Sequence, residues 1–150
     1  MRRPVLTPTE ALRTTLMHHS QPDPETVVTI VVGYIRRPEG LAAVEAAIAE
    51  ALLRGAKLVV VNTGHYGDYT HPSFAAPADL EALDAQLTEH GIEHEVRQPT
   101  QGRAPADELL DIAEEVGATL VVIGLRRRNP VGKLITGSTA QQVLLDSGCP

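Results

Sequence analysis

The segment VVTIVVGYIRRPEGLAAVEAAIAEALLRGAKLVVV, residues 27–61, alternates short apolar runs with one amphipathic stretch. Residues 27–32 are rich in β-branched side chains, which favour a strand, and residues 58–61 are a second apolar run of strand length. Between them, apolar residues recur at helical spacing, at Leu41, Val44, Ile48 and Leu52. Gly55 can adopt the left-handed conformation that commonly ends a helix. A strand, a helix and a strand in this order predict two parallel strands joined by a right-handed crossover.

The same unit is repeated along the rest of the chain. The further elements expected are helices at 80–87, 109–116 and 139–146 and strands at 92–96 and 119–123. Gly91 and Gly117 end the second and third helices as Gly55 ends the first. This alternation predicts an α/β fold of the Rossmann-like kind, an open parallel sheet with helices on both faces and the strand order 3-2-1-4.

The four expected strands differ in their polarity. Residues 92–96 alternate apolar side chains with Glu93 and Glu95, which is typical of a sheet edge, whereas the other three strands are continuously apolar and are expected to lie centrally. By the same alternation of strands and helices, a fifth strand should follow the helix at 139–146. Because it is absent from residues 1–150, we expect sequence beyond residue 150 or another chain to cover the fourth strand.

Composition and charge limit the classes of function. A chain of 150 residues predicts one domain, at 27–150, preceded by an N-terminal extension at 1–26. Thr7-Pro8-Thr9-Glu10 has the pattern of a helix start, so a short helix over 8–17 is predicted in that extension. The net charge of -6 argues against binding to nucleic acid or to an acidic membrane. The sequence shows no membrane span or signal peptide and only one cysteine, Cys149, so a cytoplasmic location is expected.

A ligand crevice is expected at the carboxyl ends of the first and fourth strands, where the connections diverge. The loops 33–39 and 124–138 meet there and carry six of the 13 basic residues: Arg36, Arg37, Arg126, Arg127, Arg128 and Lys133. Such a concentration of charge has a simpler interpretation as a solvated loop. However, Gly137-Ser138-Thr139 opens the fourth helix, where free backbone N–H groups suit a phosphate. The same residues suit an ordinary helix cap, and the two roles are compatible.

Two other motifs are interpreted as non-functional. Gly132-Lys133 does not form a P-loop, because its spacing from Gly124 is wrong and Leu134 replaces the residue that would bind magnesium. The segment 65–71 contains His65 and His71, which could indicate a metal ligand or a general base, but its spacing defines no third ligand. We interpret it as a polar surface loop. No catalytic residue and no metal site are predicted.

From residue 27 to residue 150 the chain resembles the universal stress protein family. The resemblance is carried by VVIG at 121–124, by the loop 125–136, by GSTA at 137–140 and by the late Cys149-Pro150. The nucleotide signature of the family is Gly, two residues, Gly, nine residues, then Gly and Ser or Thr. Gly124, Gly137 and Ser138 match it, whereas Arg127 occupies the second glycine position.

The turn after the first strand also resembles the family, with one departure. ATP-binding members usually carry an aspartate where this chain has Ile35, and that carboxylate contacts the ribose or adenine end of the nucleotide. Its loss removes an acceptor for the sugar hydroxyls. Arg127 adds a side chain where backbone approaches phosphate closely, but it also adds a cation that can pair with phosphate.

The resemblance implies a cytoplasmic stress-response protein that forms a homodimer and binds ATP or AMP, with Mg²⁺ accompanying ATP and at most slow ATP hydrolysis. The adenine is expected near Ile35 and Thr63, and the phosphates near the start of the last helix with Arg126 or Arg127. The full set of expected nucleotide-binding residues is Gly33, Tyr34, Ile35, Thr63, Ile123, Gly124, Arg126, Arg127, Gly137, Ser138 and Thr139. The alternative is a family member that binds no nucleotide and acts through dimerisation or protein partners.

Overall fold

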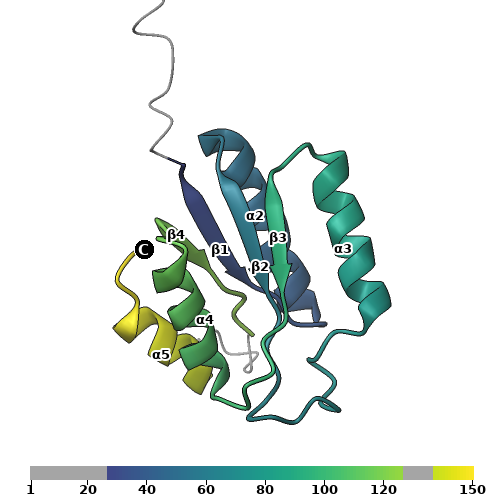
Figure 1. The fold of residues 1–150 in the computed structure, drawn as a ribbon. Helices are drawn as coiled ribbons and strands as arrows, with labels where there is room; N and C mark the ends of the chain where they lie inside the picture. Colours follow the sequence, from purple (N-terminus) through teal and green to yellow (C-terminus); the bar gives the residue numbers. More distant parts are fainter. Residues whose placement is uncertain (1–26, 127–136) are drawn as a thin grey trace, which may run out of the picture.

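The computed structural model describes residues 27–126 and 137–150, which form a parallel sheet in the order β3-β2-β1-β4. Figure 1 shows the sheet with helices packed on both of its faces. The strands are β1 (Thr29–Gly33), β2 (Lys57–Val61), β3 (His94–Arg97) and β4 (Leu120–Val122), and the helices are α2 (Pro38–Arg54), α3 (Pro77–Glu89), α4 (Pro105–Glu115) and α5 (Ser138–Asp146). The predicted fold class and strand order are confirmed. The helix predicted over 8–17 lies outside the described residues.

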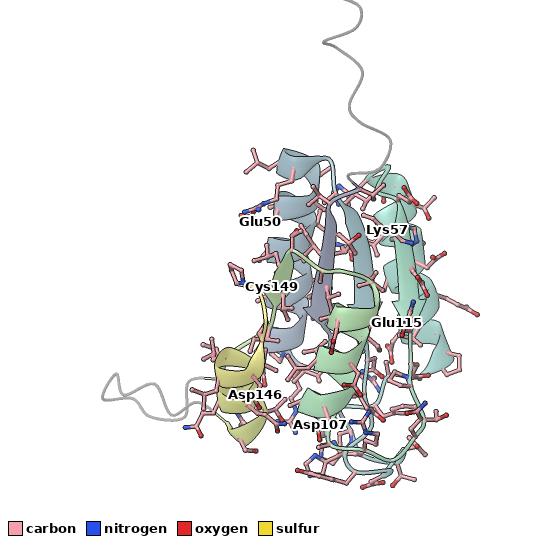
Figure 2. All side chains as sticks on the ribbon, turned by 60° about the vertical axis from the view of Figure 1, so that its left-hand side comes forward. Glu50, Lys57, Asp107, Glu115, Asp146 and Cys149 are labelled. Atoms are coloured by element: carbon pink, nitrogen blue, oxygen red, sulfur yellow. The ribbon has the colours of Figure 1, made fainter. Side chains whose placement is uncertain are left out.

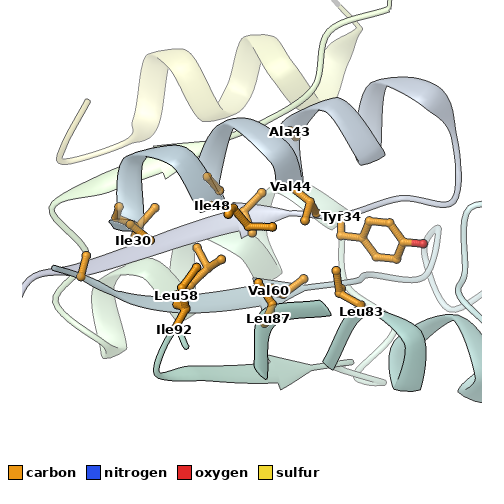
Figure 3. Packing of buried hydrophobic residues seen from close by; sticks show 14 of the residues in the cluster. Ile30, Tyr34, Ala43, Val44, Ile48, Leu58, Val60, Leu83, Leu87 and Ile92 are labelled. Atoms are coloured by element: carbon orange, nitrogen blue, oxygen red, sulfur yellow. The ribbon is translucent and has the colours of Figure 1, made fainter. Parts of the chain in front are cut away.

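The alternation of side chains along the central strands builds two cores. Ile30 and Val32 of β1 are fully buried in the core formed with α2 and α3. Figure 3 shows Ile30 with Leu58 and Val60 of β2 in this core. Val31 of β1 points to the opposite face and packs with α4 and α5. A strand with both faces buried must be apolar at every position, which is why the run at the start of the domain is continuous.

The predicted helix ends are confirmed. Gly55, Gly91 and Gly117 have φ values of 61°, 70° and 63°, in the left-handed region that favours glycine. Each of α2, α3 and α4 begins with a proline, at Pro38, Pro77 and Pro105, a residue whose missing N–H costs nothing in the first turn of a helix.

The two edge strands differ from the sequence expectation in different ways. The third strand lies at an edge as predicted, but it starts at His94 instead of residue 92. The fourth strand was expected to be central, yet in the described residues β4 is the other edge, and its three residues are half-buried. After α5 the chain returns toward β4, with Cys149 close to it (Figure 2), and the Val121 N–H donates a hydrogen bond of 2.8 Å to the Pro150 carbonyl. The outer side of β4 therefore begins to pair with the end of the chain.

Within the described ranges we find no helix that is both long enough and apolar enough to cross a membrane.

Candidate functional site

A cavity of about 370 Å³ lies at the carboxyl ends of β1, β2 and β4. Its walls come from the residues after these three strands, from the first turn of α5 and from the start of α4, where Pro105 and Leu109 contribute. The loop after β1 and the start of α5 thus meet in one cavity, as the strand order predicted. Parallel strands end at the same edge of a sheet, so loops far apart in sequence converge there.

Two glycines allow the backbone segments around this cavity to approach closely. A β-carbon on Gly40 would overlap the carbonyl group of Ile35, and one on Gly124 would overlap the carbonyl group of Glu39. The first contact folds the turn after β1 back onto α2, and the second places the end of β4 against the start of α2. Any larger residue would push these segments apart.

Most of the nucleotide-binding residues expected from the sequence lie around this cavity. Those that line it are Gly33, Tyr34, Ile35, Thr63, Ile123, Gly124, Arg126, Gly137 and Thr139. Ser138 does not line the cavity; it is the first residue of α5 and is exposed, with Gly137 as the N-cap residue. Arg127 lies outside the described residues.

The basic side chains of the two loops have different surroundings. Arg37 and Arg126 line the cavity, together with Glu39. Arg36 instead lies 3.6 Å from Asp79 at the start of α3, measured from Nε to the carboxylate oxygen, and does not line the cavity. Arg128 and Lys133 fall outside the part of the chain that the structure describes. Of the basic residues expected around the cavity, the described part of the chain places two arginines in its lining.

Tyr34 is a buried residue of the cavity wall. Burial, followed by the charge of Asp79, raises the pKa of its phenol, while Arg36 acts in the opposite direction. The hydroxyl is therefore protonated at neutral pH and can donate a hydrogen bond.

The loop between β2 and α3 contributes to the cavity, which the sequence analysis did not predict. We interpreted residues 65–71 as a polar surface loop, and most of them are exposed, but His65, His71 and Ser73 also line the cavity. The rings of His65 and His71 are stacked, with centroids 5.1 Å apart and planes at 25°. This loop follows β2 directly, so its position at the carboxyl end of a central strand was the signal that could have placed it in the site.

Asn62 holds this loop on the sheet, and the sequence analysis did not identify it. Asn62 is fully buried, and its Nδ2 donates to the carbonyl groups of Tyr34 (2.9 Å) and Ser73 (3.0 Å). Its Oδ1 accepts from the Ala75 N–H and from the Gln98 side chain, both at 2.9 Å. One buried side chain therefore links the end of β1, the loop after β2 and the residue after β3. Because every polar atom of the amide has a partner, the network stabilises one loop geometry.

Helix α4, which contributes to the cavity wall, carries a buried carboxyl group. Glu108 is 4% exposed, and burial raises the pKa of its side chain, although hydrogen bonds from the backbone of Arg103 and Gln101 act in the opposite direction. Gln142 of α5 donates a 2.6 Å hydrogen bond to Asp107, which lies on α4 in Figure 2, so α4 and α5 are joined beside the cavity.

Comparison with known proteins shows which family the chain resembles in sequence and in structure. A family model described as the universal stress protein family matches residues 27–150. A universal stress protein of Mycolicibacterium smegmatis is 44% identical over 121 residues, which cover 81% of this chain and 91% of that protein. Among solved structures, a universal stress protein from Archaeoglobus fulgidus is similar, with a TM-score of 0.68, 31% identity and coverage of 83% of this chain and 96% of that one.

A second structure shows a ligand in a protein of this kind. It is the universal stress protein from Archaeoglobus fulgidus in complex with dAMP, with a TM-score of 0.62 and 27% identity, covering 83% of this chain and 94% of that chain. The family model, the sequence identity and the shared sheet order lead to one conclusion. This chain belongs to the universal stress protein family.

Proposed function

We propose that this chain binds an adenine nucleotide, ATP or AMP, in the cavity at the carboxyl ends of β1, β2 and β4, and acts as a nucleotide-responsive stress protein. The observation that carries the proposal is the meeting of the α5 N-terminus with two arginines and the ends of β1 and β2 in one cavity of about 370 Å³. A similar protein in complex with dAMP supports the same class of ligand.

The phosphate end of the ligand would lie at the start of α5. The first N–H groups of a helix have no partner within the helix, and its dipole favours an anion there. The backbone N–H groups of Ser138 and Thr139 belong to this first turn, and Arg126 lines the cavity beside them. Ser138 would therefore contribute through its backbone, which is compatible with the position of its side chain outside the cavity lining.

The sugar and base would lie toward β1 and β2, near Ile35 and Thr63, which both line the cavity. Ile35 offers no acceptor to the sugar hydroxyls, so we expect weaker binding than a carboxylate at that position would give. One lost hydrogen bond to a charged group corresponds to roughly a tenfold loss or more.

Mg²⁺ enters the proposal only together with ATP. Magnesium prefers oxygen ligands and is commonly held by one or two carboxylates and the phosphates of a nucleotide. Among the described residues of the cavity, Glu39 provides a carboxylate and Thr139 a hydroxyl. No group of three or more His, Cys, Asp or Glu side chains within residues 27–126 and 137–150 is arranged to hold a metal. The ion would therefore bind chiefly through the phosphates of ATP.

Isothermal titration calorimetry tests the proposal with ATP, with and without Mg²⁺, and with AMP and cyclic AMP. We expect binding of ATP or AMP, and a loss of about tenfold or more in Arg126→Ala, because a charged hydrogen bond to phosphate is removed. Arg54→Ala is the matched control, because Arg54 pairs with Glu50 on α2 at 2.8 Å and does not line the cavity. Flat traces for all nucleotides would favour the alternative, a family member that acts through dimerisation or protein partners.

A homodimer and a cytoplasmic location belong to the same proposal. The half-buried strand β4 at the sheet edge supports a partner there, and Leu144 and Leu145 of the neighbouring helix α5 are 67% and 83% exposed. Light scattering coupled to gel filtration should give the mass of two chains, and a monomer mass would contradict the dimer. Cell fractionation tests the location, with recovery in the membrane pellet as the contrary result.

A further inference from the structure

We propose that His71 contacts the base of the bound nucleotide, with its Nε2–H donating a hydrogen bond to an unprotonated ring nitrogen of the purine. The inference rests on the proposed function and assigns a specificity-determining residue to the loop between β2 and α3. Four features of the structure support it: the place of His71 in the cavity, its ring tautomer, its fixed orientation and the uncharged donors at this end of the cavity.

The position of His71 separates it from the anion-binding end of the cavity. The start of α5 and Arg126 follow β4, whereas His65, His71 and Ser73 follow β2, and β1 lies between these two strands. Two strand spacings amount to about 10 Å. A ligand that fills the cavity therefore has one end at the helix N-terminus and the other at the histidines. A nucleotide, with an anionic end and an aromatic end, has this polarity.

The tautomer of His71 follows from its hydrogen bonds. The backbone N–H of Ser73 donates to Nδ1 at 3.2 Å, and the Ser73 hydroxyl lies 2.6 Å from the same atom. A backbone N–H can only donate, so Nδ1 is an acceptor and the proton of the neutral ring is on Nε2. Among the described residues, Nε2 has no hydrogen-bond partner. His71 is half-buried and lines the cavity, so its ring brings one N–H donor to the site.

The orientation of the His71 ring is restrained on several sides. One face of the ring stacks on His65, and Ser73 holds its Nδ1. The carbonyl of Ser73 accepts from the buried Asn62, which fixes the loop to the sheet. Preorganised donors of this kind lose little entropy when a ligand binds, so they contribute to specificity.

The turn that carries His65 is also well defined. The Asp68 N–H donates to the His65 carbonyl at 3.0 Å, and the central residues Tyr66 and Gly67 have φ values of 50° and 83°. Both values are positive, as in a type I′ turn. The side chain of Asp68 accepts from the N–H and the hydroxyl of Thr70, and these bonds lower the pKa of the Asp68 carboxyl. The stacked partner of His71 is thus held by a closed hydrogen-bonded turn.

The chemistry of this end suits a base better than a phosphate. The His71 N–H and the Thr63 hydroxyl are uncharged donors at this end of the cavity. The aromatic faces of the two histidines can stack on a heterocycle, and a single N–H donor matches an acceptor nitrogen at the edge of a purine. The described arginines of the cavity, Arg37 and Arg126, follow β1 and β4.

The test compares AMP with 1-deaza-AMP, 3-deaza-AMP and 7-deaza-AMP, each of which replaces one ring nitrogen by a C–H group. The wild-type chain should bind one of the three about fivefold more weakly than AMP, the change expected for one neutral hydrogen bond. His71→Phe keeps a stacking ring but has no N–H, so it should bind AMP and that analogue equally. His71→Gln, which retains a donor, should restore part of the discrimination. His90→Phe is the control, since His90 is exposed at the end of α3 and does not line the cavity.

The outcomes separate this inference from the proposed function. If the wild-type chain binds AMP and His71→Phe discriminates among the analogues as the wild type does, the contact is refuted while nucleotide binding stands. Equal binding of AMP and all three analogues by the wild type also refutes the contact. If the wild type binds neither AMP nor ATP, the proposed function itself fails, and the contact with it.

Discussion

Gly124 at the end of β4 lies so close to Glu39 at the start of α2 that a β-carbon on residue 124 would overlap the Glu39 carbonyl group. The two residues are separated by most of the domain in sequence, and their contact brings two walls of the cavity together. The first glycine of the family signature therefore has a packing reason in this chain. It lets the turn after β1 and the end of β4 approach closely enough to line one cavity.

The substitution Gly124→Ala should destabilise the fold and weaken the binding of any ligand that contacts both walls of the cavity. The added methyl group forces the start of α2 away from β4, and overpacking of this kind typically costs about 1–3 kcal/mol. Thermal unfolding followed by circular dichroism measures the loss. Gly148→Ala is the control, because a β-carbon there meets no atom within 4 Å. Equal melting temperatures for the two variants would contradict the close contact.

Asn62→Ala should destabilise the fold strongly, because Asn62 is fully buried directly after β2. The substitution leaves the Tyr34 and Ser73 carbonyls and the Ala75 N–H without their side-chain partner. Buried groups without partners cost about 1–3 kcal/mol each, so a loss of about 2 kcal/mol or more is expected in urea unfolding. Hydrogen exchange at Ala75 should also become faster.

Gln98→Ala provides the matched comparison for this network. Gln98 donates to Asn62 and to the Ala75 carbonyl, but it is only partly buried, so water can replace it. Its removal should cost clearly less than the removal of Asn62. A larger loss for Gln98→Ala would show that Asn62 is not the centre of the network.

His94 should make the stability of the fold depend on pH. Its Nδ1 lies 2.7 Å from the Ile92 carbonyl oxygen and its Nε2 lies 2.6 Å from the Asp84 carboxylate. Both acceptors favour the doubly protonated ring, and the bond to Ile92, followed by Asp84, raises the pKa of His94. A raised pKa in the folded state means that the stabilisation is complete below the ordinary value of 6.5 and is lost as pH rises through the folded-state value.

Urea unfolding between pH 5 and pH 9 checks this dependence. The free energy of unfolding of His94→Gln should vary less across this range than that of the wild type, and the difference should be largest at the acid end. His90→Gln is the control on the same side of the molecule, since His90 is exposed. A wild-type advantage that persisted unchanged at pH 9 would contradict the charged interaction.

Glu108 should also make the stability of the fold fall as pH rises, but because its charged form is disfavoured by burial. Burial raises the pKa of its carboxyl, so ionisation is harder in the folded state than in the unfolded chain. Stability therefore falls as pH rises from the ordinary value of 4.5 through the raised value. Glu108→Gln removes this penalty, and its free energy of unfolding relative to wild type should increase between pH 4 and pH 7. A difference that is constant with pH would argue against a raised pKa.

The fold could be predicted from the sequence because the residues that define it act on the conformation of their own segment. The apolar runs at β1 and β2 and the left-handed glycines Gly55, Gly91 and Gly117 define where strands and helices end. The crossover rule then makes the strands parallel, and the strand order places the loops after β1 and β4 together. The limits of β3 and β4 were less accurate, because short edge strands depend on pairing with a neighbour more than on their own residues.

The candidate site could be derived only in part. The cavity position and residues such as Gly33, Gly124 and Thr139 follow from the topology. The partners of individual side chains do not, because they come from distant segments: Arg36 lies beside Asp79 of α3 and outside the cavity lining. Likewise, the cavity role of His65 and His71 depends on Asn62, whose side chain reaches the ends of β1 and β3.

The sequence by itself determined a doubly wound parallel sheet with a cavity at the ends of β1 and β4, because apolar periodicity and glycine conformation act within a few residues. Only the tertiary structure decided which side chains face that cavity. Hydrogen bonds such as those of Asn62 join residues up to 36 positions apart, and contacts over that distance exist only after the strands have paired.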